Sequence, residues 1–468
     1  MKTGLFSIGL DTYWPQFDGL LDNLTAYHEQ IGARLKEMDT ELVDAGMVDS
    51  PEKAQDAAKL FKTEDVDIIF LFISTYALSS TVLPVVQKAK VPIVMLNIQP
   101  VAQLDYAKFN AIGDRGIMTG KWLEHCQSCS LPELANVFNR CGIDYHIVSG
   151  YLQEDYVWDE INDWVKASEV AVLMRQNRVG ILGHYYNGML DVYSDLTQQS
   201  AVFGTHFEIL EMCELYELRQ AVNEDEIQSK ITEFHHKFSV AQACDESELV
   251  RAAKTSVALD KLIEKHKLGS MAYYYEGSGE YGDIVTSIIA GNTLLTGNGV
   301  PIAGECEIKN VQAMKIMDLF GVGGSFSEFY LADYSDDVIY LGHDGPAHFA
   351  ISEGEVGLVP LSVYHGKPGK GLSIQMTVKH GPVTVLSVVT NREGKVFLQA
   401  CEGESVAGPI LQIGNTNSRY KFPMGARNFM NEWSRGGPSH HCAVGLGHIA
   451  SSLEKLSAIL GIEFRQLR

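Results

Sequence analysis

The stretch DIIFLFIS, Asp67 to Ser74, is almost continuously apolar and has no polar face. A strand that helices cover on both sides of a parallel sheet has this composition, because neither face of the strand meets water. The run is short and is preceded by polar residues, which favours a buried strand over a helix. We therefore expect Asp67–Ser74 to be a central strand of a parallel sheet.

The residues around this strand alternate between short apolar runs and helical patterns. Strands separated by helices of this length pair in parallel, which predicts a three-layer, flavodoxin-like α/β domain. Ser50 and Pro51 mark one helix start, since serine caps the first N–H groups and proline has no N–H to satisfy. The expected strands are TGLFSIGL, TELVDAG, DIIFLFIS and VPIVMLN, and the expected helices span residues 17–37, 51–62 and 80–90.

A second alternation begins after a helix expected at residues 153–176. Its strands are RVGILGH, THFEILE and MAYYYE, with one helix expected at 190–202. Beyond residue 321 the chain changes to short β-rich runs broken by glycine and proline, which predicts antiparallel strands before a terminal helix at 449–461. The sequence thus predicts an α/β protein with two flavodoxin-like three-layer α/β domains, at 1–150 and 151–320, and an antiparallel β-barrel-like C-terminal domain at 321–468.

Composition narrows the class of protein. The 468 residues carry a formal net charge of -22, which repels a phosphate backbone, and no basic patch overrides that field. No apolar run reaches the roughly 18 residues that span a bilayer, and the N-terminus lacks the apolar core of a signal peptide. The eight cysteines are scattered, as reduced thiols usually are. We expect a cytoplasmic globular protein that contacts neither nucleic acid nor membrane.

Two local motifs suggest chemistry but lack the context that each needs. GSGEYG, Gly277 to Gly282, matches the glycine pattern of a dinucleotide-binding turn, but that turn normally follows the first strand of its unit. A mobile loop at the end of a strand is the expected structure here. HCQSC, His125 to Cys129, would suit zinc only with a second C-x-x-C pair at matching spacing, and the chain has none. Free thiols on a helix are the simpler interpretation.

The stretch PIAGECEIKN, Pro301 to Asn310, places two carboxylates, Glu305 and Glu307, between a glycine and an apolar periodic segment. The periodicity predicts a helix from Glu305 onward, with Glu305 in its first turn. Acids are common at this position because the positive end of the helix dipole stabilises them. Glu305 by itself is therefore explained without chemistry, and a functional role depends on other residues.

Four further polar residues change that balance. Glu328, in SFSEFYLADY, alternates with aromatic residues along an expected strand, and a carboxylate buried in this way needs a partner. His343 ends another expected strand, and His440 and His441 precede the terminal helix. Carboxylates and imidazoles together suit Mn²⁺, Mg²⁺ or Co²⁺, whereas each histidine alone is as well explained as a hydrogen-bonded structural residue.

These motifs, in this order, resemble the L-arabinose isomerase and L-fucose isomerase superfamily, and the arabinose branch more closely. GECEIKNVQAMKIM, Gly304 to Met317, is similar to that branch's G-E-G-D-W-K-x-A-x-x-x-x-x-M. GGSFSE, Gly323 to Glu328, is similar to G-G-T-S-F-M-E-D-Y. LGH, ending at His343, resembles G-S-H-M-L-E, and GGPSHHC, Gly436 to Cys442, resembles G-G-x-H-H-T.

The resemblance implies a metal-dependent aldose–ketose isomerase of open-chain sugars, with Mn²⁺, Co²⁺ or Mg²⁺ as cofactor. It implies four metal ligands: Glu305, Glu328, His343 and His441. Glu305 and Glu328 would also transfer protons through a cis-enediol, and His440 would contact the sugar. A Lewis acid makes such a transfer feasible, because it acidifies the C–H beside a carbonyl enough for a carboxylate to remove the proton. The family further implies a homotrimer or homohexamer with active sites at subunit interfaces.

The resemblance does not extend to the walls of the sugar pocket. Asp11 stands where the arabinose enzymes have a sugar-contacting glutamine, and Asp344, Gly345 and Pro346 replace Met-Leu-Glu. This difference predicts a substrate other than arabinose: another pentose, a hexose, a tetrose or a branched sugar. Loops and strand ends supply five candidate pocket residues besides His440, namely Asp11, Tyr13, His184, Tyr186 and Tyr275.

Two other classes of protein remain as alternatives. A non-catalytic sugar-binding or regulatory protein could have the same α/β layout, although retention of all four ligand residues favours an enzyme. A nucleotide-dependent oxidoreductase would rest on GSGEYG alone and would bind a dinucleotide tightly.

Overall fold

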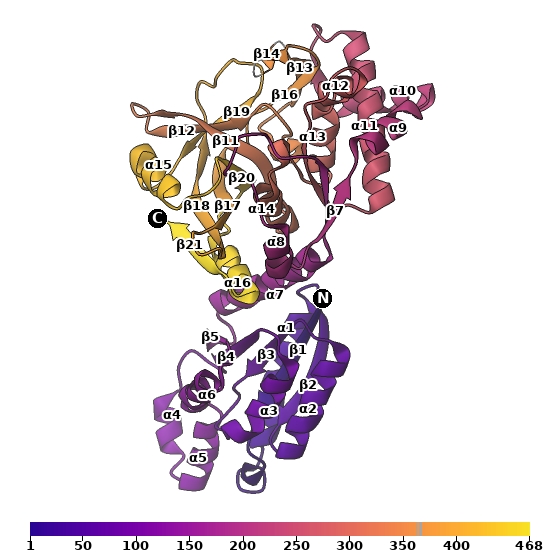
Figure 1. Ribbon diagram of the computed structural model, residues 1–468. Helices are drawn as coiled ribbons and strands as arrows, with labels where there is room; N and C mark the ends of the chain where they lie inside the picture. Colours follow the sequence, from indigo (N-terminus) through magenta and orange to yellow (C-terminus); the bar gives the residue numbers. More distant parts are fainter. Residues whose placement is uncertain (362, 365–366) are drawn as a thin grey trace. The chain divides into compact units, whose positions relative to one another are not determined.

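The structure is a computed structural model that describes residues 1–361, 363–364 and 367–468 (Figure 1). Its contacts divide the chain into two compact units, Met1–Val172 and Leu173–Arg468. The boundary falls within helix α7 (Asp155–Gln176). None of the helices in the described part of the chain is long and apolar enough to cross a membrane.

The first unit contains a parallel sheet of five strands in the order β2-β1-β3-β4-β5. All five residues of β3 (Ile68–Phe72) are buried in the middle of this sheet, which confirms DIIFLFIS as a central strand. The other strands are β1 (Lys2–Ile8), β2 (Glu41–Val48), β4 (Ile93–Gln99) and β5 (His146–Tyr151). The helices before α7 are α1 (Leu20–Lys36), α2 (Pro51–Glu64), α3 (Ser79–Ala89), α4 (Tyr106–Ala111), α5 (Arg115–Leu123) and α6 (Gln127–Cys141).

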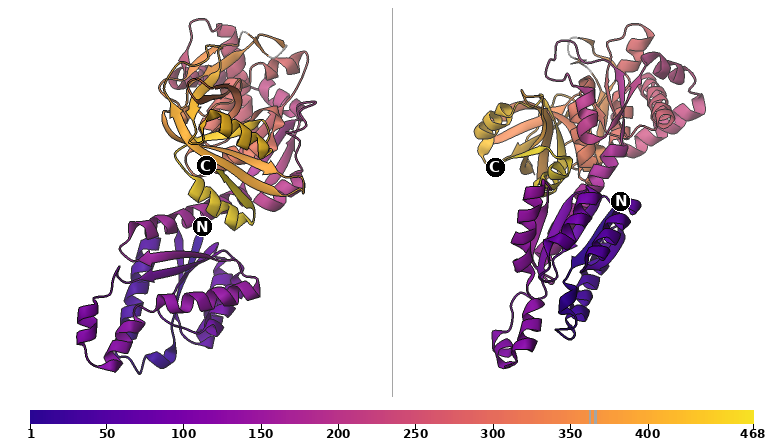
Figure 2. Two further views of the ribbon diagram at one scale, coloured as in Figure 1. Left: turned by 90° about the vertical axis from the view of Figure 1, so that its left-hand side faces the viewer. Right: turned by 60° about the horizontal axis from the view of Figure 1, so that its bottom comes forward.

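Helices cover both faces of this sheet (Figure 2). Apolar residues of α2, α3 and α6 pack in one cluster with Phe6 and Leu71, while α1 lies against the opposite face, where its Gly32 adjoins Leu5. The expected start of α2 is confirmed, because the Ser50 side chain accepts a hydrogen bond from the Lys53 N–H at 3.3 Å and Pro51 is the first helical residue.

The second unit begins with a parallel sheet of four strands in the order β10-β9-β6-β7. These strands are β6 (Arg178–Gly183), β7 (His206–Leu210), β9 (Ser270–Tyr274) and β10 (Ile302–Ala303). The helices around them are α8 (Leu196–Phe203), α9 (Met212–Gln220), α10 (Glu224–Lys237), α11 (Glu246–His266), α12 (Glu280–Val285), α13 (Ile289–Gly297) and α14 (Ile308–Leu319).

A larger sheet of seven strands follows, drawn mostly in orange and yellow in Figure 2, in the order β17-β20-β11-β12-β19-β18-β21. Its pairings are antiparallel except that of β18 with β21, and β17 also pairs with β18. The mixed α/β class is thereby confirmed. The strands are β11 (Gly323–Asp333), β12 (Val338–His343), β17 (Gly381–Thr390), β18 (Val396–Val406), β19 (Thr416–Lys421), β20 (His441–Leu446) and β21 (Glu463–Leu467).

The remaining elements are small or peripheral. Helices α15 (Gly425–Arg435) and α16 (Ala450–Leu460) adjoin the large sheet, and β21 follows α16 where no strand was expected. The minor strands are β8 (Ser239–Val240), β13 (Gly357–Pro360), β14 (Val363–Tyr364), β15 (Lys367–Pro368) and β16 (Leu372–Gln375), and the 3-10 turns are η1 (Asp11–Tyr13), η2 (Gly304–Cys306) and η3 (Phe349–Ile351).

Helix α14 lies in the interior of the second unit. It contacts β9 and β10 of the parallel sheet as well as β11, β17 and β20 of the large sheet, and its residues 308–317 are all buried. A helix buried on every side has no polar stripe to mark it, so its position between two sheets follows only from the tertiary structure. Its N-terminus carries the acidic stretch of Pro301–Asn310 to the edges of both sheets.

Two expected helix starts are wrong. The helix expected at 190–202 begins only at Leu196, because Asp195 caps it by accepting the N–H of Gln198 at 3.1 Å. Residues 184–195 therefore form a loop after β6. The helix expected from Glu305 begins at Ile308 with Glu307 as its N-cap residue, and Glu305 lies in the preceding 3-10 turn.

Candidate active site

The turn before α14 sends its two carboxylates in different directions. Glu305 has the left-handed backbone angles φ 55° and ψ 15°, which are rare for a residue with a side chain. Glu307 is extended and its side chain is only 1% exposed. Glu305 lines a cavity, while Glu307 points into the protein interior.

Strand register brings three more ligand-type residues to this turn. Glu328 on β11 pairs with Gly342 of β12 on one side and with His441 of β20 on the other. His343 directly follows Gly342 and ends β12. Antiparallel neighbours lie within about 5.5 Å of each other at the Cα atoms, so this register places Glu328 beside His441 and one residue away from His343.

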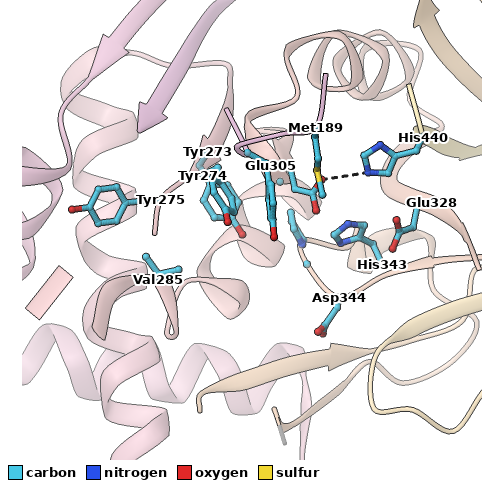
Figure 3. A pocket seen from close by; sticks show the side chains of 14 residues that line it. Met189, Tyr273, Tyr274, Tyr275, Val285, Glu305, Glu328, His343, Asp344 and His440 are labelled. Carbon is cyan, nitrogen blue, oxygen red and sulfur yellow. Dashed lines mark ion pairs between the residues drawn. The ribbon is translucent and has the colours of Figure 1, made fainter. Parts of the chain in front are cut away.

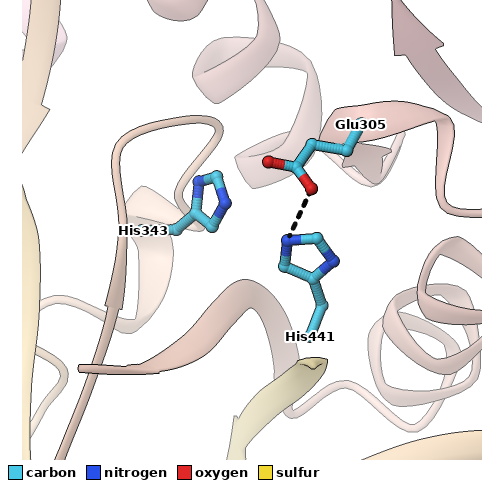
Figure 4. A group of neighbouring side chains, drawn as sticks. All are labelled: Glu305, His343 and His441. Carbon is cyan, nitrogen blue, oxygen red and sulfur yellow. Dashed lines mark ion pairs between the residues drawn. The ribbon is translucent and has the colours of Figure 1, made fainter. Parts of the chain in front are cut away.

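The side chains converge as the strands do (Figure 4). Glu305, His343 and His441 offer ligand atoms that all lie within 4.8 Å of one another, and Glu328, His440 and His441 form a second such group. The Glu305 Oε2 and His441 Nε2 atoms are 3.4 Å apart. Phe326 supports the cluster from below, since its ring centroid lies 4.4 Å from those of both His343 and His441.

Two buried atoms of this cluster bear on metal binding. Glu305 Oε2 and His441 Nε2 are shielded from solvent and have no hydrogen-bond partner among the described residues. Buried polar atoms are nearly always satisfied, and a carboxylate facing the lone pair of an imidazole suits a divalent cation. The donor set of two carboxylates and two imidazoles therefore fits the expected metal.

Glu307 determines which nitrogen of His441 is available. Its Oε2 lies 2.6 Å from His441 Nδ1, and the two side chains are 1% and 0% exposed. A carboxylate that accepts Nδ1–H leaves the Nε2 lone pair free, and this arrangement orients histidine ligands in metal proteins. Sequence reasoning missed Glu307, although its position two residues after Glu305 was visible.

His440 lies between two carboxylates. Its Nδ1 is 2.6 Å from Asp191 Oδ2, and its Nε2 is 3.4 Å from Glu305 Oε2. Burial alone would lower the pKa of His440, but its interactions with Glu305 and Asp191 outweigh burial and raise that pKa to about 9. Asp191 was not predicted, because its loop was expected to be helical.

Glu305, Glu328, His343 and His440 line a cavity of about 140 Å³ (Figure 3). Glu328, His343 and His440 lie toward one end, whereas Tyr275 and Val285 lie at the other. No arginine or lysine is among the lining residues in the described part of the chain. The lining residues are Tyr186, Met189, Tyr273, Tyr274, Tyr275, Val285, Gly304, Glu305, Glu328, His343, Asp344, Gly345, Pro346 and His440.

Tyrosines form the wall that faces the carboxylates. The rings of Tyr186 and Tyr274 are 4.5 Å apart, and the Tyr274 hydroxyl donates to Glu276 Oε1 at 2.5 Å. Burial, followed by the contact with Glu276, raises the pKa of Tyr274 well above its usual range. The wall is therefore neutral and amphipathic, as suits a polyhydroxylated ligand with apolar C–H faces.

The expected pocket residues divide into two groups. Tyr186, Tyr275 and His440 line the cavity, whereas His184 is not among the lining residues and has its ring 5.7 Å from that of Tyr274. Asp11 and Tyr13 belong to the first unit, in η1. Lining residues that sequence reasoning did not assign as candidates are Met189, Tyr273, Tyr274, Val285, Gly304, Asp344, Gly345 and Pro346.

Neither weak motif is part of the cluster or of the cavity lining. In the described part of the chain, the candidate metal groups contain neither His125 nor Cys126 and Cys129 of HCQSC. The glycine-rich GSGEYG leads into the short helix α12, with Gly279 as its N-cap, where a loop was expected. Asp283 of α12 pairs with Arg219 at 2.7 Å, which ties this helix to α9.

Comparisons with known proteins give little guidance. No family model and no curated protein sequence matches this chain. A periplasmic solute-binding protein of an ABC transporter from Actinobacillus succinogenes 130z, solved with bound D-allose, is 12% identical, covers 65% of this chain and 77% of its own, and has a TM-score of 0.15. A substrate-binding protein of a sugar ABC transport system from Bordetella parapertussis 12822 is 9% identical, with coverages of 69% and 80% and a TM-score of 0.15.

Proposed function

We propose that this chain is a metal-dependent aldose–ketose isomerase that acts on an uncharged, open-chain sugar. The observation that carries the proposal is that Glu305, Glu328 and His343, from three separate segments, line one cavity, while His441 shares a ligand-type group with Glu305 and His343 and another with Glu328. These are the residues to which the resemblance to arabinose isomerases gives the metal. The buried, unsatisfied atoms of Glu305 and His441 support the same assignment.

The reaction would use the two carboxylates as acid and base. Glu305, Glu328, His343 and His441 would hold a divalent cation, Mn²⁺ or else Co²⁺ or Mg²⁺, which supplies Lewis acidity to the carbonyl and hydroxyl oxygens of the sugar. One carboxylate would remove the proton from the hydroxyl-bearing carbon, while the hydroxyl proton passes to the former carbonyl oxygen, which gives a cis-enediol in its singly deprotonated form. The same or the opposite carboxylate would return a proton to the adjacent carbon, and the deprotonated oxygen becomes the new carbonyl, so an aldose becomes a ketose.

The rest of the cavity would select the substrate. The lining has carboxylates but no arginine or lysine among the described residues, so a sugar phosphate or sugar acid would be repelled. His440 would donate a hydrogen bond to a sugar oxygen, and Tyr186 and Tyr274 would cover C–H faces. Asp344, Gly345 and Pro346 of this lining stand where the arabinose enzymes have Met-Leu-Glu, which is why another pentose, a hexose, a tetrose or a branched sugar is the proposed substrate.

We propose the finer architecture and assembly on the same basis. The strand order β2-β1-β3-β4-β5 is that of flavodoxin-like sheets, which supports a flavodoxin-like first domain. The extra pairing of β17 with β18 supports a barrel-like C-terminal domain. A homotrimer or homohexamer with active sites at subunit interfaces remains a proposal from the resemblance. The eight cysteines, all free thiols, support a reducing compartment such as the cytoplasm.

Turnover is the decisive test. Tetroses, pentoses, hexoses and branched sugars would be incubated with the protein and Mn²⁺, and ketose formation would be measured. Binding of Mn²⁺ at 100 times its dissociation constant should stabilise the folded protein by about 2.7 kcal/mol, seen as a higher melting temperature. Glu305→Gln should abolish both turnover and the Mn²⁺-dependent shift, because it removes a ligand and a proton carrier.

The alternative is a non-catalytic sugar-binding or regulatory protein with the same fold. It would bind a sugar without converting it. Sugar binding without ketose formation, in the presence of bound Mn²⁺, would favour this alternative and contradict the isomerase.

A further inference from the structure

The loop at residues 184–195 meets His440 through a single side chain. Asp191 Oδ2 accepts the backbone N–H of His440 at 3.0 Å and lies 2.6 Å from Nδ1 of the same residue. One carboxylate oxygen thus holds both the main chain and the ring of His440. Two contacts to one residue remove rotational freedom about χ1 and χ2 that a ring contact alone would leave.

The main chain of Asp191 is fixed as well. Its carbonyl oxygen accepts from the Ser439 hydroxyl at 3.1 Å and from Lys309 Nζ at 2.5 Å. Ser439 directly precedes His440, and Lys309 lies in the first turn of α14, beside the turn that carries Glu305. Asp191 therefore connects the loop after β6, the start of α14 and the approach to β20.

These contacts fix the orientation of the His440 ring relative to the cavity. With Nδ1 held by Asp191, the opposite nitrogen, Nε2, faces the cavity and lies 3.4 Å from Glu305 Oε2. The same loop contributes Tyr186 and Met189 to the cavity wall. The loop at residues 184–195 therefore both holds the His440 ring and forms part of that wall. A substrate oxygen that approaches Glu305 would meet His440 Nε2 at the same point.

We propose that Asp191 is a positioning residue of this site, which fixes the His440 ring so that Nε2 meets the reacting oxygens of the sugar. The inference rests on the proposed function for the identity of the substrate, but the contact itself does not. Asp191 is not among the residues that line the cavity, and it acts through His440.

The kinetic test compares substitutions of Asp191 with a neighbour. Asp191→Ala should lower kcat by about 10–100-fold, with KM and Mn²⁺ affinity changed by no more than about twofold, because only orientation is lost. Asp191→Asn, which keeps a hydrogen-bond acceptor, should lower kcat by a smaller factor than Asp191→Ala. Ser439→Ala is the matched control, since it removes a contact to the Asp191 carbonyl and leaves the carboxylate contacts intact. A loss confined to KM or to Mn²⁺ affinity, or an equal loss in Ser439→Ala, would overturn the proposal.

A spectroscopic test separates this inference from the proposed function. In metal-free protein with ¹⁵N-labelled histidine, the hydrogen-bonded Nδ1–H of His440 should give a downfield proton signal, assigned by its absence in His440→Gln. The signal should disappear in Asp191→Ala and persist in Ser439→Ala, with thermal melts confirming that both variants fold. Persistence of the signal in Asp191→Ala would refute the positioning role. Absence of turnover in the wild type with the signal behaving as expected would refute the isomerase alone.

Discussion

The Glu307 carboxylate lies 2.6 Å from Nδ1 of His441, and water reaches almost none of either side chain. Both groups come from chain segments that meet only because α14 packs against β20. The contact turns Nε2 of His441 toward Glu305, at 3.4 Å. Of the two acids of PIAGECEIKN, Glu305 therefore lines the cavity, and Glu307 orients His441, which faces Glu305.

Removal of the Glu307 charge should weaken metal binding. Glu307→Gln keeps a hydrogen-bond acceptor for Nδ1–H but makes His441 a poorer donor, so Mn²⁺ affinity should fall by about 10–100-fold, measured by calorimetric titration. Glu393→Gln, at an exposed position, is the control and should leave the affinity unchanged. Wild-type affinity in Glu307→Gln would mean that His441 is not a ligand or needs no orienting partner.

The backbone of Glu305 should be strained. Its left-handed conformation is costly for any residue with a Cβ atom, and such strain often persists at functional sites. Glu305→Ala and Glu305→Gly both remove the carboxylate, so their difference reports the backbone alone. We expect Glu305→Gly to be more stable by about 1 kcal/mol in denaturant unfolding. Equal stability of the two variants would argue against the left-handed turn.

Gly183, the last residue of β6, and Gly188, in the loop that follows, distinguish the cost of a steric clash from the cost of backbone strain. Gly183 (φ 88°) and Gly188 (φ 93°) have similar backbone angles, but a Cβ at Gly183 would overlap the Tyr274 carbonyl, whereas one at Gly188 would meet nothing. Gly188→Ala should cost about 1–2 kcal/mol of unfolding free energy and Gly183→Ala about 2–4. Urea unfolding of both variants measures the difference. Similar costs would contradict the close approach of β6 to β9.

Helix α12, which contributes Val285 to the cavity, should loosen in acid. Burial alone would raise the pKa of Asp283, but Lys370, Arg251 and Arg219 together lower it overall. A carboxyl whose pKa is lower in the folded chain than in the unfolded chain stabilises the folded protein. This contribution is fully present at pH values above the unfolded-state pKa of about 3.9. That contribution is lost as the pH falls through the folded value.

Asp283→Asn should therefore destabilise the protein by about 1–3 kcal/mol near neutral pH, because it removes the charge that three cations contact. The difference in unfolding free energy between the wild type and the variant should become smaller below a pH of about 4. Guanidinium unfolding over this pH range measures this difference, with Asp159→Asn at an exposed position of α7 as control. A difference that stays constant down to pH ~3 would show that Asp283 has no depressed pKa.

Local patterns predicted the elements well where burial is periodic or complete. DIIFLFIS identified β3, and Ser50 with Pro51 marked the start of α2. The start of α8 was wrong because local pattern does not show that residues 184–195 form a loop. Tertiary contacts show it: Asp191 bonds Lys309 of α14 and also Ser439 and His440, which precede β20. The start of α14 was wrong because a left-handed Glu305 has no signature in sequence.

The sequence by itself determined the alternation of strands and helices, the change to a β-rich C-terminal part and the acidic and histidine residues at strand and turn ends. These features depend on burial periodicity and turn chemistry, which act between near neighbours in the chain. The tertiary structure alone decided that Glu328 pairs with His441, that Glu307 reaches His441 and that Asp191 holds His440. Those contacts depend on strand register and on the placement of α14 between two sheets, which no local pattern encodes.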